Sequence, residues 1–252
     1  MLSTVLHALD VLEFLAEKGE SGISEISKNL GLAPSTTHRL VSSLVSRYFL
    51  VQNPVNKKYK LGMKIFQIGS SVANRFGFRR AAFGNMERLA AESNETVNLG
   101  ILDNDKVIYV EKILNDDPIR VELQIGHTVP AQCTGMGKAI LAYLAPDKLT
   151  GLLRNIRYEK RTGNSIESEE RLRGELARIR EQGYALDDGE LIEGIRCIAA
   201  PVFGKNGAVV AAVSIAGPSF RLTDDRVREL VPLVKAAAVD TSKQLEFSAF
   251  NL

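Results

Sequence analysis

The stretch Cys133-Thr134-Gly135-Met136-Gly137-Lys138-Ala139 combines glycines with a lysine, a pattern found in loops that bind phosphate groups. A phosphate-binding loop would need Gly at 132 and Ser or Thr at 139, where this chain has Gln132 and Ala139. The dinucleotide fingerprint also fails, because Ile140 occupies the place of its third glycine. What remains is a glycine-rich loop that opens a helix. The free amides and the dipole of such a helix start suit a carboxylate.

The two cysteines, Cys133 and Cys197, could form a redox pair or, with Asp187 and His127, a metal site. Neither has the short spacing of a redox C-x-x-C motif or of a zinc ribbon, so the sequence predicts no metal and no cofactor. A hydrolase elbow of the G-x-S-x-G type is absent from the sequence. We therefore expect a protein that is not an enzyme. Two alternatives stay open: a thiol-based redox-sensing regulator, and a thiol enzyme that uses Cys133 or Cys197.

The charges of the 252-residue chain are unevenly placed, although its net charge is only +2. From Ile26 to Met86 there is no Asp or Glu, while the same stretch holds ten Lys and Arg residues. The rest of the chain holds the other 22 basic residues and all 30 acidic ones, a net charge of −8. Such asymmetry indicates a module that binds a polyanion, joined to a second module.

The start of the basic segment has the pattern of a helix-turn-helix. Apolar residues at helical spacing predict a first helix over residues 2–16. A short second helix follows, with Ser24 as its expected N-cap and Gly31 as its left-handed C-terminal residue. Pro34 then suits the first turn of a third helix. The side chains expected to meet DNA from this recognition helix are Ser35, Thr36, Thr37, His38 and Arg39.

A basic hairpin is expected after the recognition helix. Residues 48–51 and 59–61 are predicted strands, and Asn53-Pro54-Val55-Asn56 is their turn. Arg47, Lys57, Lys58 and Lys60 are expected to contact phosphates, which positions a protein on DNA without reading sequence. Residues 63–78 are then predicted to form an amphipathic linker helix that packs against a partner subunit.

The pattern changes near residue 80 to that of an α+β domain around a mainly antiparallel sheet. Strands are expected at 96–102, 106–113, 119–125, 184–186, 197–203 and 209–215. Helices are expected at 83–93, 135–144, 146–154, 168–182 and from Thr223 onward. The predicted domains are therefore 1–62 (winged helix-turn-helix), 63–79 (linker helix) and 80–252 (the α+β domain).

The composition fits a soluble globular protein, with 45% hydrophobic and 25% charged residues. The longest apolar run, residues 208–213, is far shorter than the roughly 20 residues of a membrane span. The N-terminus lacks the pattern of a targeting peptide. Two cysteines are too few for a disulfide scaffold, so we expect a cytoplasmic protein without membrane contact.

Several motifs in this order and spacing resemble the IclR family of bacterial transcription regulators, over nearly the full length. They are residues 33–40 (Ala-Pro-Ser-Thr-Thr-His-Arg-Leu), 59–62 (Tyr-Lys-Leu-Gly), 133–139, 183–190 (Gly-Tyr-Ala-Leu-Asp-Asp-Gly-Glu), 194–201 (Gly-Ile-Arg-Cys-Ile-Ala-Ala-Pro) and 214–218 (Ser-Ile-Ala-Gly-Pro). The resemblance implies a winged helix-turn-helix, a linker helix and a GAF-like effector-binding domain. It also implies a homodimer or homotetramer on double-stranded DNA with a palindromic operator.

The resemblance further implies where a small-molecule effector binds. The effector's carboxylate is expected at the amides of Gly135 and Met136, and its other polar groups at Asp187, Cys197 and Ser214. Family members can carry a second Ser where this chain has Ala216, so one hydrogen bond to the ligand is missing here. The implied function is a regulator, preferably a repressor, of a catabolic operon, switched by a small organic acid or sugar acid.

Overall fold

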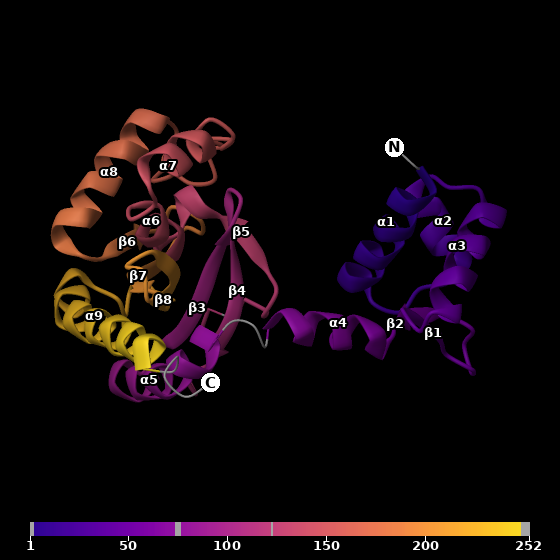
Figure 1. Ribbon diagram of the computed structural model, residues 1–252, viewed down its shortest axis with the longest axis horizontal. Coiled ribbons are helices and arrows are strands. Elements are labelled where there is room, and N and C mark those ends of the chain that lie inside the picture. Colours follow the sequence, from indigo (N-terminus) through magenta and orange to yellow (C-terminus); the bar gives the residue numbers. More distant parts are fainter. Residues whose placement is uncertain (1–2, 74–76, 122, 248–252) are drawn as a thin grey trace. The chain divides into compact units, whose positions relative to one another are not determined.

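The computed structural model describes residues 3–73, 77–121 and 123–247. These residues form two compact units, one within residues 1–76 and one within residues 77–252 (Figure 1). The elements of the first unit are α1 (Ser3–Lys18), α2 (Ile23–Leu30), α3 (Pro34–Ser46), β1 (Leu50–Gln52), β2 (Tyr59–Leu61) and α4 (Met63–Ala73). Three helices followed by an antiparallel hairpin make a winged helix-turn-helix.

The first unit has its own small core, to which every element before α4 contributes. The fully buried side chains include Val11 and Leu15 of α1, Ile26 of α2, Val41 of α3 and Leu50 of β1. In contrast, Val5, Leu6 and Leu9 of α1 are exposed, together with four apolar side chains of α4, Met63, Phe66, Ile68 and Val72. The predicted helical course through residues 74–76 lies outside the described residues.

The helix ends of this unit follow local backbone chemistry. Gly31 has φ of 65° at the end of α2 and Pro34 opens α3, which confirms both predictions. The predicted N-cap Ser24 is wrong, because α2 already begins at Ile23 after Gly22. A bridge in which Ser21 and Tyr59 exchange hydrogen bonds of 2.9 and 2.8 Å holds the preceding chain extended, so the helix starts directly after it.

The first strand of the hairpin is shorter than predicted. The amides of Tyr48 and Phe49 donate to the carbonyls of Val45 and Leu44, each at 2.9 Å, which closes the end of α3. Tyr48 takes φ of 64°, so the extended conformation begins only at Leu50.

The second unit is an α+β domain with one six-stranded sheet. Its elements are α5 (Gly77–Ser93), β3 (Thr96–Asp103), β4 (Lys106–Ile113), β5 (Thr128–Pro130), the 3-10 turn η1 (Ala131–Cys133), α6 (Gly135–Leu141), α7 (Pro146–Leu153), α8 (Glu169–Gln182), β6 (Ala185–Asp188), β7 (Ile195–Phe203), β8 (Val209–Pro218) and α9 (Asp224–Phe247). The strand order is β5-β4-β3-β8-β7-β6 and every neighbouring pair is antiparallel. This confirms the predicted fold class.

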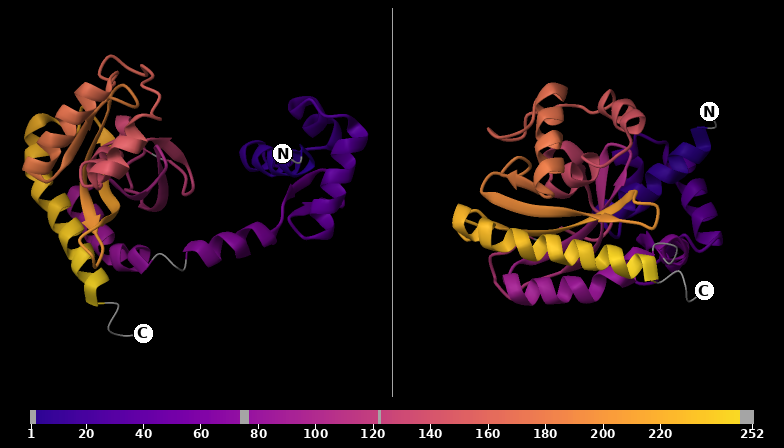
Figure 2. Two further views of the ribbon diagram at one scale, coloured as in Figure 1. Left: turned by 45° about the horizontal axis from the view of Figure 1, so that its top comes forward. Right: turned by 60° about the vertical axis from the view of Figure 1, so that its left-hand side comes forward.

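Helices cover both faces of this sheet. The helices α5 and α9 lie side by side on one face, and α6, α7 and α8 lie on the other (Figures 1 and 2). The main core lies on the α6 side and joins buried residues of α6 and α8, such as Ile140 and Leu176, to sheet residues such as Val107 and Ala199. The start of α6 is thereby fixed against the middle of the sheet.

The strand predicted at residues 119–125 is wrong for the described residues of that segment. Asp117 accepts a hydrogen bond from the amide of Ile119 at 2.7 Å, which makes a turn at its start. Gly126, with φ of 87°, makes a second turn and donates to the carbonyl of Tyr109. The described residues between these turns are irregular, and the edge strand β5 begins only at Thr128.

Candidate functional site

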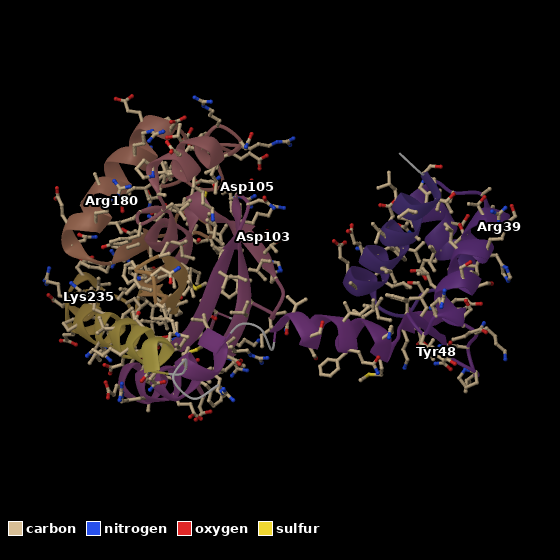
Figure 3. The ribbon with its side chains drawn as sticks, in the orientation of Figure 1. Arg39, Tyr48, Asp103, Asp105, Arg180 and Lys235 are labelled. Carbon is tan, nitrogen blue, oxygen red and sulfur yellow. The ribbon has the colours of Figure 1, made fainter. Side chains whose placement is uncertain are left out.

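The recognition helix α3 presents most of its predicted DNA-contacting side chains to solvent. Ser35, His38 and Arg39 are exposed and Thr36 is half-buried. Figure 3 shows Arg39 on the outer surface of α3. Thr37 is the exception, with 0% of its surface exposed and its hydroxyl donating to the carbonyl of Ala33 at 3.2 Å. We therefore assign Thr37 to the packing of the helix start, and this corrects the prediction that it meets DNA.

The hairpin is held in shape by asparagines and by one acid. Asn53 and Asn56 accept the amides of Val55 and Lys58, each at 2.9 Å, which shapes the turn. Asn56 also donates to Glu20 at 3.2 Å. Hydrogen bonds from Asn53 and Asn56, helped by Lys60 and Lys58, lower the pKa of Glu20. The Glu20 carboxylate thus stays ionised at neutral pH and helps to order the turn.

The basic side chains of this unit are free to meet an anion. Arg39, Arg47, Lys57, Lys58 and Lys60 are all exposed. Within the described part of the chain none of these five forms an ion pair. Unpaired cations on the helix and on the hairpin are the electrostatic footprint expected of a DNA-binding surface.

Sequence reasoning missed one residue of this surface. Tyr48 was expected inside a strand, but the residue is 75% exposed next to Arg47, at the start of the hairpin (Figure 3). An aromatic ring with a hydroxyl group can contact the phosphate-sugar backbone. The local sequence does not predict the exposure of Tyr48, since it depends on a left-handed backbone conformation that tyrosine rarely adopts.

In the second unit, the five residues predicted to bind an effector line one cavity. Gly135 and Met136 come from the start of α6, Asp187 from β6, Cys197 from β7 and Ser214 from β8. The remaining described lining residues are mostly apolar: Tyr109, Val121, Leu123, Thr134, Leu191, Ile192, Ile195 and Ala216. Residues as far apart in sequence as Tyr109 and Ala216 thus meet at one place.

The sheet register explains why these positions meet. Asp187 pairs with Cys197, and Cys197 pairs with Ala216, so the three side chains form a row on one face of the sheet. Ser214 lies two residues before Ala216 on the same strand and therefore points to the same face. The sheet thus forms the cavity floor, and the start of α6 forms one wall.

Two glycines allow α6 to approach the sheet so closely. A Cβ atom on Gly137 would lie 2.1 Å from the carbonyl oxygen of Ala131, and one on Gly135 would lie 3.3 Å from the Cβ of Ala199. The hydroxyl of Thr134 caps the helix by accepting the amide of Gly137 at 3.1 Å. The amides of Gly135 and Met136 have no acceptor inside the helix, and they lie at the cavity.

A buried ion pair lies directly behind Asp187. The ammonium group of Lys138, with 0% of the side chain exposed, pairs with the carboxylate of Glu190 and donates to the carbonyl of Leu186 at 2.6 Å. It also lies 3.7 Å from the carboxylate of Glu175 on α8. Sequence reasoning treated Lys138 only as part of a failed phosphate motif. The sequence signal for its burial was the position of this lysine between a glycine and a run of apolar residues.

Burial changes the titration of two groups that line the cavity, Asp187 and Cys197, and of Cys133, which precedes the lining residue Thr134. Loss of solvation, together with the nearby Glu190 charge, raises the pKa of Asp187 to about 7. Burial likewise raises the pKa of the Cys133 thiol to about 11, and it raises the pKa of the Cys197 thiol well above its usual value. Thiolate is the reactive form of cysteine, so neither thiol is primed for redox or nucleophilic chemistry near neutral pH.

The cavity is narrow. It encloses about 20 Å³, room for about one water molecule. Two irregular segments supply much of its cover, one with Val121 and Leu123 and one with Leu191, Ile192 and Ile195. A ligand larger than water must displace side chains of these segments.

Two further features are absent from the described residues. No group of three or more His, Cys, Asp or Glu side chains is placed to hold a metal ion. None of the described helices has the length and apolar character to cross a lipid bilayer.

Comparisons with known proteins match both units. Residues 4–54 match the family model described as "IclR helix-turn-helix domain", and residues 70–243 match "Bacterial transcriptional regulator IclR C-terminal". The chain is 34% identical over 246 residues to the HTH-type transcriptional regulator KdgR of Escherichia coli K12, covering 98% of this chain and 94% of that protein. It is 32% identical over 244 residues to the transcriptional repressor IclR of the same organism, with coverage of 96% and 89%. The crystal structure of the Thermotoga maritima IclR superposes with a TM-score of 0.82 at 29% identity, covering 98% of this chain and all of that one.

Proposed function

The chain belongs to the IclR family of bacterial transcriptional regulators, which are not enzymes, and we propose that it is a repressor of a catabolic operon switched by a small organic acid or sugar acid. The observation that carries this proposal is the convergence of Gly135, Met136, Asp187, Cys197 and Ser214 on one cavity. The preference for repression follows relatives that are named as repressors, such as IclR and AllR of Escherichia coli K12.

The DNA-binding part of the proposal uses the exposed residues of the first unit. Ser35, Thr36, His38 and Arg39 would read base edges in the major groove. Arg47, Lys57, Lys58 and Lys60 would contact phosphates, and their exposure without ion pairs supports this.

The effector-binding part uses the cavity. The free amides of Gly135 and Met136 would hold the effector's carboxylate, and Asp187, Cys197 and Ser214 would hold its other polar groups. Apolar side chains cover the rest of the lining, which fits a short carbon chain better than an extended polar one. The raised pKa values of both thiols weigh against the redox-sensing and thiol-enzyme alternatives.

We also propose that the protein acts in the cytoplasm as a homodimer, or as a homotetramer built from two dimers. The exposed apolar side chains on α1 and α4 are the surfaces that a second copy would cover. A twofold dimer matches a palindromic operator, with half-sites one helical turn of about 34 Å or a multiple of it apart.

The experiment that tests this function is a fluorescence-anisotropy titration at fixed salt. It compares the intergenic DNA beside the gene with an unrelated fragment of equal length. A preference of ~10³ or more for the intergenic DNA is expected of a specific regulator. Equal, weak binding to both fragments would contradict regulation at this operator.

A further inference from the structure

The cavity contains one carboxylic acid side chain and no basic side chain among its described lining residues, and this limits which acids it can bind. Asp187 is only 3% exposed and faces the cavity. One of its oxygens, Oδ1, accepts the backbone amide of Glu190 at 2.8 Å. Within the described residues Asp187 forms no ion pair.

The nearest buried cation is already engaged by other groups. Lys138 pairs with Glu190, donates to the carbonyl of Leu186 and lies near Glu175. The other titratable groups facing Asp187 are Cys197 on β7 and Tyr109 on β4, both neutral because burial raises the pKa of each. Three carboxyl groups, Glu190, Glu175 and Asp187, therefore share the neighbourhood of a single ammonium group.

An effector carboxylate would bring a further negative charge beside Asp187. Two carboxylates side by side in a buried site without a cation are strongly disfavoured, and such pairs keep one proton between them. We propose that Asp187 meets the effector as a neutral carboxylic acid, so that the cavity binds a small monocarboxylate together with one proton. The neutral Asp187 donates its proton in a hydrogen bond to a ligand oxygen.

The absence of a basic side chain among the described lining residues also excludes ligands with a second anionic group. A dicarboxylate or a phosphorylated sugar acid would bury another charge against a lining that offers no Lys, Arg or His among its described residues. The inference rests on the proposed function, since it takes the ligand to be an organic acid. It narrows that class to acids with one negative charge.

The proton makes affinity depend on pH with a definite sign. Free Asp187 has a pKa raised to about 7, so below that pH it already carries the proton that the complex needs. Above it, the proton must be taken up when the acid binds. Affinity for a monocarboxylate is therefore expected to be ~10-fold greater at pH 6 than at pH 8.

The test uses full-length protein and four matched pairs of acids that differ by one anionic group. The pairs are lactate and malate, 2-oxobutyrate and 2-oxoglutarate, gluconate and 6-phosphogluconate, and benzoate and terephthalate. Isothermal titration calorimetry at pH 6 and pH 8 gives the affinities. Repeating it at pH 8 in two buffers of different ionisation enthalpy counts the protons taken up.

The expected result is binding of at least one singly charged acid, with about one proton taken up at pH 8 and about none at pH 6. Its doubly charged partner is expected to bind at least ~10-fold more weakly. Equal affinity at both pH values, or no proton uptake at pH 8, would overturn the inference and leave the organic-acid function standing. Tighter binding of the doubly charged partners would do the same. No binding of any of the eight acids would contradict the organic-acid function itself.

Two variants distinguish the contribution of Asp187 to the pH dependence of binding from that of its neighbour Asp188. Asp187→Asn imitates the neutral acid and is expected to bind the same monocarboxylate with pH-independent affinity. Asp188→Asn is the matched control, because Asp188 follows on the same strand but is exposed and pairs with Arg196. It is expected to keep the pH dependence. Proton counting on the unaltered protein keeps the test decisive if Asp187→Asn folds poorly.

Discussion

The backbone amide of Glu190 donates a hydrogen bond of 2.8 Å to Oδ1 of Asp187, while the carboxylate of Glu190 pairs with buried Lys138. One residue thereby connects the polar group of the cavity to α6, the helix whose start forms the cavity wall. The segment after β6 is held further by Thr162, whose hydroxyl donates to the carbonyl of Gly189 at 2.6 Å, and by Ser165, whose hydroxyl donates to that of Glu190 at 2.9 Å. Asp187 is thus oriented, before any ligand enters, by a backbone hydrogen bond from a segment that the Glu190–Lys138 ion pair and these hydroxyl contacts hold in place.

Removing the buried cation should be costly for stability. Lys138→Met leaves Glu190 buried without its partner, and we expect a loss of about 3–5 kcal/mol in the free energy of unfolding. The double variant Lys138→Met, Glu190→Leu should recover most of that loss, since it removes both charges. Urea denaturation followed by circular dichroism measures both changes.

Lys160→Met is the matched control, because Lys160 forms an exposed ion pair with Glu167 at 3.4 Å. Its expected cost is below about 1 kcal/mol. If Lys138→Met cost no more than Lys160→Met, the buried pair would not hold this region together.

The close approach of α6 to the sheet predicts a strict requirement for glycine at position 137. Gly137→Ala places a Cβ 2.1 Å from the carbonyl oxygen of Ala131, so the helix start must shift and the free energy of unfolding should fall by roughly 1–3 kcal/mol. Gly151→Ala on α7 is the control, since nothing lies within 4 Å of its added Cβ. Alanine is the better helix former, so that variant should be neutral or up to about 1 kcal/mol more stable. Equal thermal melting of the two variants would argue against the tight α6 contact.

The exposed cations of the first unit are expected to play two different roles in DNA binding, base reading and phosphate contact. Arg39→Ala is expected to weaken binding to operator DNA by ~1–3 kcal/mol and to change binding to random DNA much less, since it would read a base. Lys58→Ala should weaken both alike and lower the slope of log affinity against log salt by about one, since it would contact phosphate. Anisotropy titrations over a salt series distinguish the two. Equal losses for Arg39→Ala on both DNAs would remove it from base reading.

The raised pKa of Asp187 also makes folding stability depend on pH. The folded protein binds this proton up to about pH 7, whereas the unfolded chain releases it near the ordinary value of 3.8. Between these values the native state holds more protons, so its stability should fall as pH rises through this window. Denaturation midpoints at several pH values should show this decline, and Asp187→Asn should flatten it. A variant with the same pH profile as the unaltered protein would show that Asp187 does not titrate in this range.

Much of the fold could be predicted from local signals. Gly31 and Pro34 mark helix ends because their backbone preferences are strong, and alternating apolar residues define most strands. The failures lie where long-range contacts decide. The bridge between Ser21 and Tyr59 moves the start of α2, and the turns at Asp117 and Gly126 keep the described residues between them out of the sheet.

For the candidate site, too, local motifs predict one part and long-range contacts decide the rest. The sequence motifs are sufficient to predict the identity of the lining residues, because each motif has a characteristic residue at each position. These residues are Gly135, Met136, Asp187, Cys197 and Ser214. Their meeting at one cavity depends on sheet register, which no single motif contains. The burial of Lys138 and of Thr37 could not be predicted, since both residue types are usually exposed and only the packing of neighbouring elements covers them.

The central claim is that an acid in this cavity sets the affinity for DNA. The most direct measurement follows anisotropy of labelled intergenic DNA with the unaltered protein and with Ala216→Leu, whose larger side chain fills the cavity. The exposed Ala208, changed to Leu, is the control. The titrant is whichever of lactate, 2-oxobutyrate, gluconate and benzoate binds most tightly. We predict that the acid changes the DNA affinity of the unaltered protein and of Ala208→Leu by ~10-fold or more, while Ala216→Leu binds DNA but does not respond. An equal response from Ala216→Leu, or no response from the unaltered protein to an acid that it binds, would contradict the claim.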